Sequence, residues 1–205
     1  MLLWQVRYGT SGAAKLINAQ PLKCISHVSG QEAIVIHNGQ FLEDDEERSR
    51  EKSDTHAFTE RLAMTAAKNW DEIIKKRIKD EKGAFSLIIG VPSEDVLYLI
   101  RDKHGFRPLC YGLLKKGDGT MWVAASESYA LERLGVDASD IFQVQSGQIL
   151  KLELGKTQPE EIANYRSAQQ RPCSFEAVYL QRPESKIHSG EDKTVGEVRY
   201  QTGQM

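Results

Sequence analysis

Short apolar runs bounded by turn residues recur through the first 155 residues. They are rich in β-branched and aromatic side chains and predict strands at residues 32–36, 84–90, 96–101 and 121–125. Residues 91–95 (VPSED) have the Pro, Ser and Asp of a hairpin connection, which predicts antiparallel pairing of the strands on either side. Leucines alternate with polar residues over 148–154, as expected for a half-buried strand.

Between these strands lie segments in which apolar residues recur at helical spacing. This spacing predicts helices over residues 55–68, 70–79 and 126–134. Asn69 is placed to cap the second helix, and Gly135 can take the left-handed conformation that closes the third. The mixture of helices and hairpin-connected strands predicts an α+β fold with mainly antiparallel sheet.

The composition changes after Gly155. Residues 156–172 are polar and predict a linker, and residues 184–205 have few apolar anchors and predict a loose tail. A short ordered run is expected around residues 175–180. The pattern therefore divides the chain into a domain over 1–155 and a connecting segment over 156–205.

Charge and cysteine content limit the possible partners and compartments. The chain has 40% hydrophobic and 27% charged residues with a formal net charge of −2, so no basic excess points to nucleic acid or an anionic membrane. No run of 18 apolar residues or secretory signal is present, and we expect a cytoplasmic protein. The three cysteines are widely spaced and predict reduced, partly buried thiols.

Several segments combine residues that can carry chemistry. Arg7 precedes a turn rich in Gly and hydroxyl groups and can hold a carboxylate or form an ordinary salt bridge. Asn38 and Gly39 follow a predicted strand and present an amide and a backbone N–H to a developing oxyanion, or simply form a tight turn. Asp54 can bind an ammonium group or cap the helix that follows it, and capping is the simpler role.

Two further segments favour structural roles. Residues 101–109 (RDKHGFRPL) gather cations and an Asp around one Gly, as a solvated charged hairpin does. Glu127 lies where a strand leads into a helix and can anchor a polar network or interact with the helix terminus.

The order of these motifs resembles that in amidophosphoribosyltransferases over nearly the whole chain. The matching segments are VRYGTSG, NAQPL, HNGQ, SDT, RDKHGFRPL, ASES, CSFEAVYLQRPES and VRYQTGQ. The resemblance implies a glutamine amidotransferase type 2 domain with the four-layer αββα sandwich of N-terminal-nucleophile (Ntn) hydrolases. Relative to the family the chain looks shortened at both ends, so we expect the sandwich to be incomplete at its N-terminal edge.

The resemblance also implies roles for individual residues. Arg7 would hold the α-carboxylate of glutamine, Asp54 its α-ammonium, and Asn38 with Gly39 would form the oxyanion hole. In the family an N-terminal cysteine attacks the glutamine amide, and the released ammonia converts phosphoribosyl pyrophosphate to phosphoribosylamine in a second domain. No Cys follows Met1 here, so we expect the chain alone to be inactive.

Cofactors are not expected in this chain. By resemblance, Mg²⁺ would belong to the transferase domain. Cys173 lies where some family members bind an iron–sulfur cluster, but a cluster needs about four thiolates and the other cysteines have no matching role.

Glutamine is the expected ligand, and a homo-oligomer is an open expectation. The alternatives to part of an active enzyme are a non-catalytic glutamine-binding or interaction paralogue and another class II amidotransferase without its nucleophile.

Overall fold

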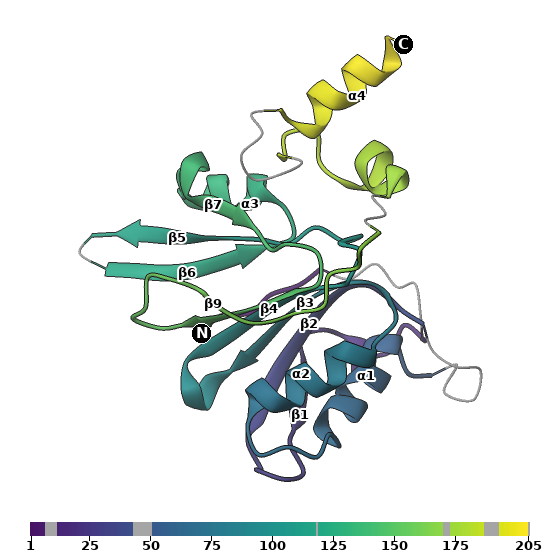
Figure 1. Ribbon diagram of the computed structural model, residues 1–205, viewed down its shortest axis with the longest axis vertical. Coiled ribbons are helices and arrows are strands. Elements are labelled where there is room, and N and C mark those ends of the chain that lie inside the picture. Colours follow the sequence, from purple (N-terminus) through teal and green to yellow (C-terminus); the bar gives the residue numbers. More distant parts are fainter. Residues whose placement is uncertain (7–11, 43–50, 118, 170–172, 187–192, 205) are drawn as a thin grey trace.

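The chain folds as two antiparallel sheets with helices on their outer faces (Figure 1). The computed structural model describes residues 1–6, 12–42, 51–117, 119–169, 173–186 and 193–204. The larger sheet has the order β1 (Leu22–Ile25), β2 (Glu32–Phe41), β3 (Gly83–Val91), β4 (Val96–Arg101), β8 (Gln148–Glu153) and β9 (Glu160–Asn164). The smaller sheet has the order β6 (Gly119–Ala125), β5 (Cys110–Lys116) and β7 (Ile141–Gln143).

The helices of the described residues are short. They are α1 (Asp54–Ala63), α2 (Trp70–Asp80), α3 (Ser128–Leu134) and α4 (Val195–Gly203). Single 3₁₀ turns occupy Leu16–Asn18, Pro92–Glu94 and Ala138–Asp140, and a π-helical turn occupies Glu176–Leu180. None of the helices in the described ranges is long and apolar enough to cross a bilayer.

Three apolar clusters lie between four layers. The first joins α1 and α2 to the larger sheet, with Phe58 and Trp70 packed against strand residues such as Val35. The second lies between the two sheets and includes Leu99 and Leu109, and the third packs α3 against the smaller sheet. Figure 1 shows the same order, with α1 and α2 on one side of the larger sheet and the smaller sheet and α3 on the other. The four-layer αββα expectation is therefore confirmed.

Helix positions agree closely with the sequence pattern. Asn69 caps α2 by accepting a hydrogen bond from the N–H of Glu72 at 2.9 Å, and Gly135 ends α3 with φ of 98°. Helix α1 ends at Ala63, five residues before the predicted end. Ser53, one residue before the helix, is its N-cap and accepts from the N–H of His56 at 3.2 Å.

The hairpin of β3 and β4 is antiparallel as predicted, and Asp95 closes its turn with φ of 52°. Strand β4 reads as a continuous apolar run because its alternate residues face the two different clusters, with Tyr98 on the helix side and Leu99 on the side of the smaller sheet. Leu154, predicted as part of β8, lies beyond its end and is exposed.

Strand β2 is longer than the sequence predicts. It continues through His37, Asn38 and Gly39 to Phe41, and residues 34–41 pair with β3. Asn38 and Gly39 therefore lie inside a strand, and their interpretation as a tight turn is wrong. Gly39 has φ of 140°, where a Cβ would lie only 2.0 Å from the carbonyl oxygen of Ala84.

The segment after Gly155 has more structure than its polar composition suggests. Strand β9 pairs with β8 inside the expected linker, so the larger sheet continues past residue 155. The predicted ordered run at 175–180 is confirmed as the π-helical turn. Helix α4 replaces part of the predicted loose tail, and a capping box between Thr194 and Glu197 starts it.

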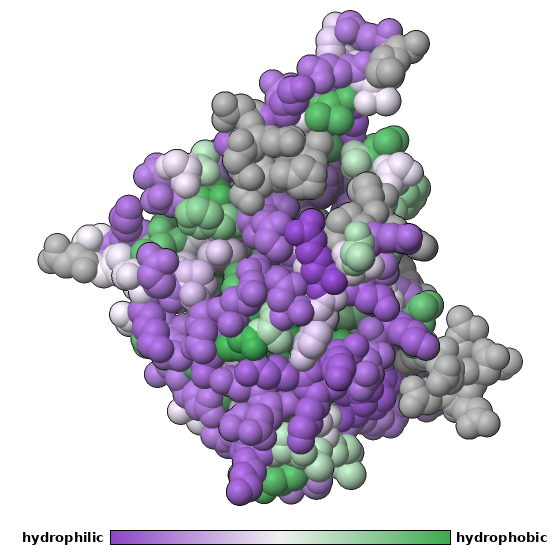
Figure 2. Space-filling model, in the orientation of Figure 1, coloured by the Kyte–Doolittle hydropathy of each residue, from purple (hydrophilic) through white to green (hydrophobic). Residues whose placement is uncertain are grey.

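Apolar side chains lie exposed at this end of the molecule, near the top of Figure 2. They are Phe175 just before the π-helical turn, Val178, Tyr179 and Leu180 within it, and Tyr200 on α4. The two elements are joined by Arg199, whose guanidinium donates to the carbonyl oxygens of Ala177 at 2.8 Å and Gln181 at 2.7 Å.

Candidate glutamine site

The candidate site begins at an edge of β2 that β1 leaves uncovered. Strand β1 pairs only with residues 32–35 of β2, so polar side chains take over the later backbone groups. The N–H of His37 donates to Oε1 of Gln20 at 2.7 Å, and its carbonyl oxygen accepts from Nε2 of Gln5 at 2.6 Å. These contacts satisfy the strand edge without another strand.

Asp54 occupies the same edge from the start of α1. Its Oδ2 accepts from the N–H of Phe41 at 2.9 Å, and its Oδ1 accepts from the N–H of Thr55 at 2.8 Å. The carboxylate is buried, with 4% of the residue exposed. Since Ser53 caps α1, capping is not the role of Asp54, which instead bridges the helix and β2.

Gly39 lies between the two edge residues His37 and Phe41. In an antiparallel strand, alternate residues direct their N–H and C=O groups to the same side. Phe85, the partner of Gly39, uses both of its backbone groups to bond Asp102 on the opposite side, at 3.2 Å and 3.0 Å. The N–H of Gly39 therefore faces the edge that holds Asp54.

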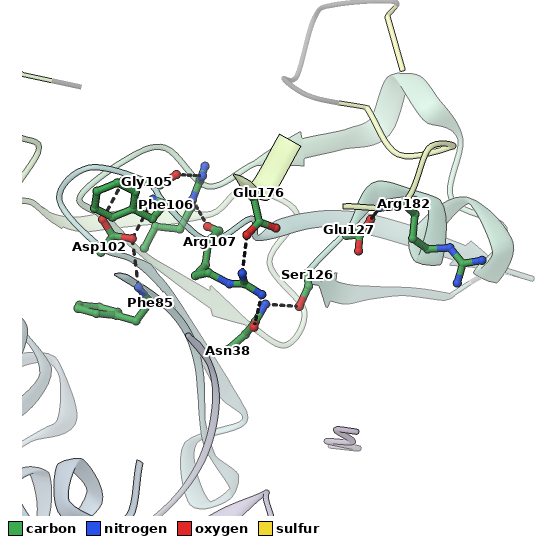
Figure 3. Close-up of polar contacts among 11 residues, drawn as sticks. Asn38, Phe85, Asp102, Gly105, Phe106, Arg107, Ser126, Glu127, Glu176 and Arg182 are labelled. Atoms are coloured by element: carbon green, nitrogen blue, oxygen red, sulfur yellow. Dashed lines mark hydrogen bonds and ion pairs between the residues drawn. The ribbon is translucent and has the colours of Figure 1, made fainter. Parts of the chain in front are cut away.

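Asn38 extends from β2 toward the smaller sheet (Figure 3). Its Oδ1 accepts from Nη2 of Arg107 at 2.8 Å, and its Nδ2 donates to Oγ of Ser126 over a long 3.4 Å. Arg107 also donates through Nη1 to Oε2 of Glu176 at 2.5 Å. Asn38 thus meets two groups that lie far from it in the sequence, and Arg107 links it to Glu176 in a third segment.

The loop that holds Arg107 is built around a buried carboxylate. Asp102, with 2% exposed, accepts from the N–H groups of Phe85, His104, Gly105 and Phe106 at 2.8–3.2 Å. The guanidinium of Arg101 donates to three backbone carbonyl oxygens, those of Gly105, Val144 and Arg107. The expected solvated charged hairpin is therefore wrong, because both its acid and its first cation bind backbone.

Glu127 anchors a network, one of the two roles that the sequence allows. It precedes α3, and its Oε2 accepts from the N–H of Arg182 and from Oγ of Ser185, both at 2.7 Å. Ser128 adds a third link by accepting from the N–H of Lys186 at 2.9 Å. These bonds hold the segment after the π-helical turn against the start of α3.

The structure brings together some of the site residues predicted from the sequence but does not describe all of them. The structure brings Gly39 and Asp54 to one edge, with Asn38 beside them on β2, whereas Arg7 lies outside the described residues. Sequence reasoning missed Arg107, Glu176 and Gln20 as neighbours of the site. The Asp-x-x-Gly spacing at Asp102 is a turn signature that could have indicated an ordered loop, but nothing local identifies the contact of Arg107 with Asn38.

Two of the three thiols are poor nucleophiles. Burial, with a smaller effect of Glu32, raises the pKa of Cys24 to about 12. The pKa of Cys110 is also raised to about 12, mainly by burial and to a smaller extent by the negative charge of Glu127. Cys173 is partly exposed. In the part of the chain that the structure describes, no cluster of three metal-binding side chains includes any of them.

Thiol labelling should separate these cysteines. Under native conditions at pH 8, iodoacetamide should modify Cys173 in minutes. Its reaction with Cys24 and Cys110 should be at least about a hundredfold slower, because the thiolate is the reacting form and both of these side chains are buried. Peptide mass spectrometry with and without guanidinium measures the rates. Rapid native labelling of Cys24 or Cys110 would contradict their placement in the core.

Comparisons with known proteins agree with this architecture. The family model described as a glutamine amidotransferase domain matches residues 15–133. The amidophosphoribosyltransferases of Rattus norvegicus and Methanothermobacter thermautotrophicus are 31% and 30% identical, each over 97% of this chain. The glutamine phosphoribosylpyrophosphate amidotransferase of B. subtilis, solved in complex with ADP and GMP, superposes over 90% of the chain with a TM-score of 0.70 and 25% identity.

The chain spans about two fifths of the length of these relatives, 42% and 41% of the two sequences and 39% of the solved chain. Its two antiparallel sheets and outer helices match the Ntn hydrolase fold of the solved relative's glutaminase domain. The matched region covers more than half of the 205 residues. The chain therefore belongs to the glutamine amidotransferase domain family, in the form found in amidophosphoribosyltransferases.

Proposed function

We propose that this chain binds glutamine at the uncovered edge of β2 and supplies the glutamine-handling part of an amidophosphoribosyltransferase. The observation that carries the proposal is the bond from the N–H of Phe41 to Asp54, which holds a buried carboxylate two residues from Gly39. The α-ammonium of glutamine needs an anion and its carboxamide oxygen needs neutral donors, and this edge offers both.

Each part of glutamine has a partner in this proposal. Asp54 binds the α-ammonium and Arg7 the α-carboxylate, while Asn38 Nδ2 and the N–H of Gly39 meet the carboxamide oxygen. Neutral donors suit that oxygen because negative charge develops there when the amide is attacked. In the complete reaction, the ammonia released from glutamine displaces pyrophosphate from phosphoribosyl pyrophosphate and so forms phosphoribosylamine.

We further propose that these 205 residues bind glutamine without hydrolysing it. Attack on the carboxamide needs an activated nucleophile, such as a thiolate, beside the oxyanion donors. Cys24 and Cys110 are buried with a raised pKa, which removes them as nucleophiles. If no other nucleophile acts at this site, the burial of these thiols favours the second candidate function, a non-catalytic glutamine-binding or interaction paralogue.

Calorimetry of the purified chain with glutamine tests the binding. Asp54→Asn and Arg7→Ala should each weaken binding at least about tenfold, because each removes a charge that opposes a charge on the ligand. Asp137→Asn, at an exposed position after α3, is the matched control and should bind like the wild type. A folded wild-type chain that gives no heat with glutamine would end the proposal.

An ammonia-release assay on the same sample separates binding from catalysis. The expected rate is background at saturating glutamine. Thiol-dependent release that disappears in Cys173→Ala would instead identify that partly exposed thiol as a nucleophile and contradict the non-hydrolysing role.

A further inference from the structure

We propose that Arg107 is a positioning residue that fixes the orientation of the Asn38 amide, and that Glu176 holds Arg107 in place. The proposal rests on the function proposed above for Asn38. It concerns a contact between β2, the loop after β4 and the π-helical turn, which are drawn together in Figure 3.

The side-chain amide of Asn38 has two orientations with nearly the same shape. One presents Nδ2 as a donor toward the ligand, and the other presents Oδ1, which repels a carboxamide oxygen. A guanidinium has only donors, so Arg107 can face Asn38 only through Oδ1, and the bond measures 2.8 Å. Arg107 therefore selects the orientation in which Nδ2 remains a donor.

The remaining contact of the amide leaves this donor accessible to a ligand. Nδ2 reaches Oγ of Ser126 only at 3.4 Å, the long limit of a hydrogen bond. A ligand oxygen at an ordinary distance of about 2.9 Å would be the better acceptor. Ser126 thus serves as a weak resting partner that a carboxamide oxygen can replace.

Arg107 is fixed from two sides. Its Nη1 donates to Glu176 at 2.5 Å, and the side chains of Arg107 and Glu176 are only 22% and 8% exposed. The planar fork of the guanidinium, bonded at both terminal nitrogens, has little freedom to rotate. Asp102 and Arg101 fix the backbone of the loop from which Arg107 extends.

Glu176 connects this arrangement to the C-terminal segment. Burial raises its pKa, and the neighbouring Arg107 partly offsets that effect. Because the guanidinium of Arg199 on α4 donates to the carbonyl oxygens of Ala177 and Gln181, the position of Glu176 depends on α4. The orientation of Asn38 is therefore coupled to the π-helical turn and to α4.

Calorimetry with two ligands tests the positioning role. Norvaline has the α-carboxylate and α-ammonium of glutamine but no carboxamide. Arg107→Ala should weaken glutamine binding about tenfold and leave norvaline binding unchanged within about twofold, because only the carboxamide meets Asn38. Arg107→Lys keeps a head group with donors only but lacks the fork that bonds Asn38 and Glu176 at once, so it should lose part of the preference for glutamine over norvaline. Glu176→Gln should also lose part of this preference.

Controls separate positioning from damage to the fold. Lys103→Ala removes an exposed cation from the same loop and should leave both ligands unaffected. In an Asn38→Ala background, Arg107→Ala should add no further loss for glutamine. Equal weakening of both ligands by Arg107→Ala, or an undiminished preference for glutamine, would overturn the positioning role.

A second measurement does not depend on glutamine binding. The ¹⁵N relaxation order parameter of the Asn38 side-chain amide should be high in the wild type and lower in Arg107→Ala, with unchanged values for amides elsewhere in β2. An Asn38 amide that stays equally ordered without Arg107 would refute the inference. A wild-type chain with an ordered Asn38 amide and no affinity for glutamine would refute only the proposed function.

Discussion

Gly39→Ala is expected to lower the free energy of unfolding by more than about 4 kcal/mol. Gly39 has φ of 140°, a conformation that side chains rarely adopt, and its Cβ would lie 2.0 Å from the carbonyl oxygen of Ala84 and 2.7 Å from Cα of Phe85. Both atoms belong to the backbone of β3, so β2 and β3 would have to separate. Guanidinium denaturation followed by circular dichroism measures the loss.

Gly30→Ala provides the matched control. Gly30 also has a positive φ, of 69°, but a Cβ there meets no atom of the described residues within 4 Å. It should lose only about 1 kcal/mol, the strain of the left-handed conformation alone. Similar losses for the two variants would show that β2 and β3 do not approach as closely as the structure places them.

Asp102→Ala should have the second largest effect, a loss of about 3 to 5 kcal/mol. The carboxylate accepts from four backbone N–H groups, and alanine would leave all four without their acceptor. Asp102→Asn should lose less, about 2 kcal/mol, because one oxygen remains while the new NH₂ group faces backbone donors.

The same denaturation experiment checks Asp102, with Asp137→Asn as the exposed control. The loop after β4 should loosen in both Asp102 variants, and Arg107 should lose its fixed position with it. An Asp102→Ala protein as stable as the control would mean that the loop does not depend on this carboxylate.

The regular elements were predictable where one physical signal dominated. Helix α2 combines an apolar face, an Asn cap and acidic residues in its first turn, and its predicted and observed bounds differ by one residue. Strand β4 is a continuous apolar run beside a Pro-containing turn, and its bounds were predicted without error.

Elements were missed where close packing or pairing outweighed local composition. Strand β5 contains Gly112, which interrupts its apolar pattern, yet a Cβ there would lie 2.8 Å from Cγ1 of Val136 and 2.9 Å from the carbonyl oxygen of Asp140. Strand β9 is polar because it is an edge strand, held by its pairing with β8. Asn38 and Gly39 were read as ending a strand because Asn-Gly favours turns, but pairing with β3 carries β2 past them.

In the candidate site too, local sequence motifs predicted some residues, whereas others are brought in only by tertiary packing. Asn38, Gly39 and Asp54 were named from motif order, and the structure places Asp54 beside the edge that Gly39 faces. Arg107 and Glu176 lie 69 residues apart in sequence, as do Arg107 and Asn38, so no local pattern could associate them. Contacts of this kind depend on how the two sheets and the C-terminal segment pack.

A crystal structure of the chain grown with glutamine tests the central claim most directly. The account predicts intact glutamine at the uncovered edge of β2, with its α-ammonium on Asp54 and its carboxamide oxygen within hydrogen-bond distance of Asn38 Nδ2 and the N–H of Gly39. Glutamine bound elsewhere, or turned so that its carboxamide lies away from Asn38 and Gly39, would contradict it.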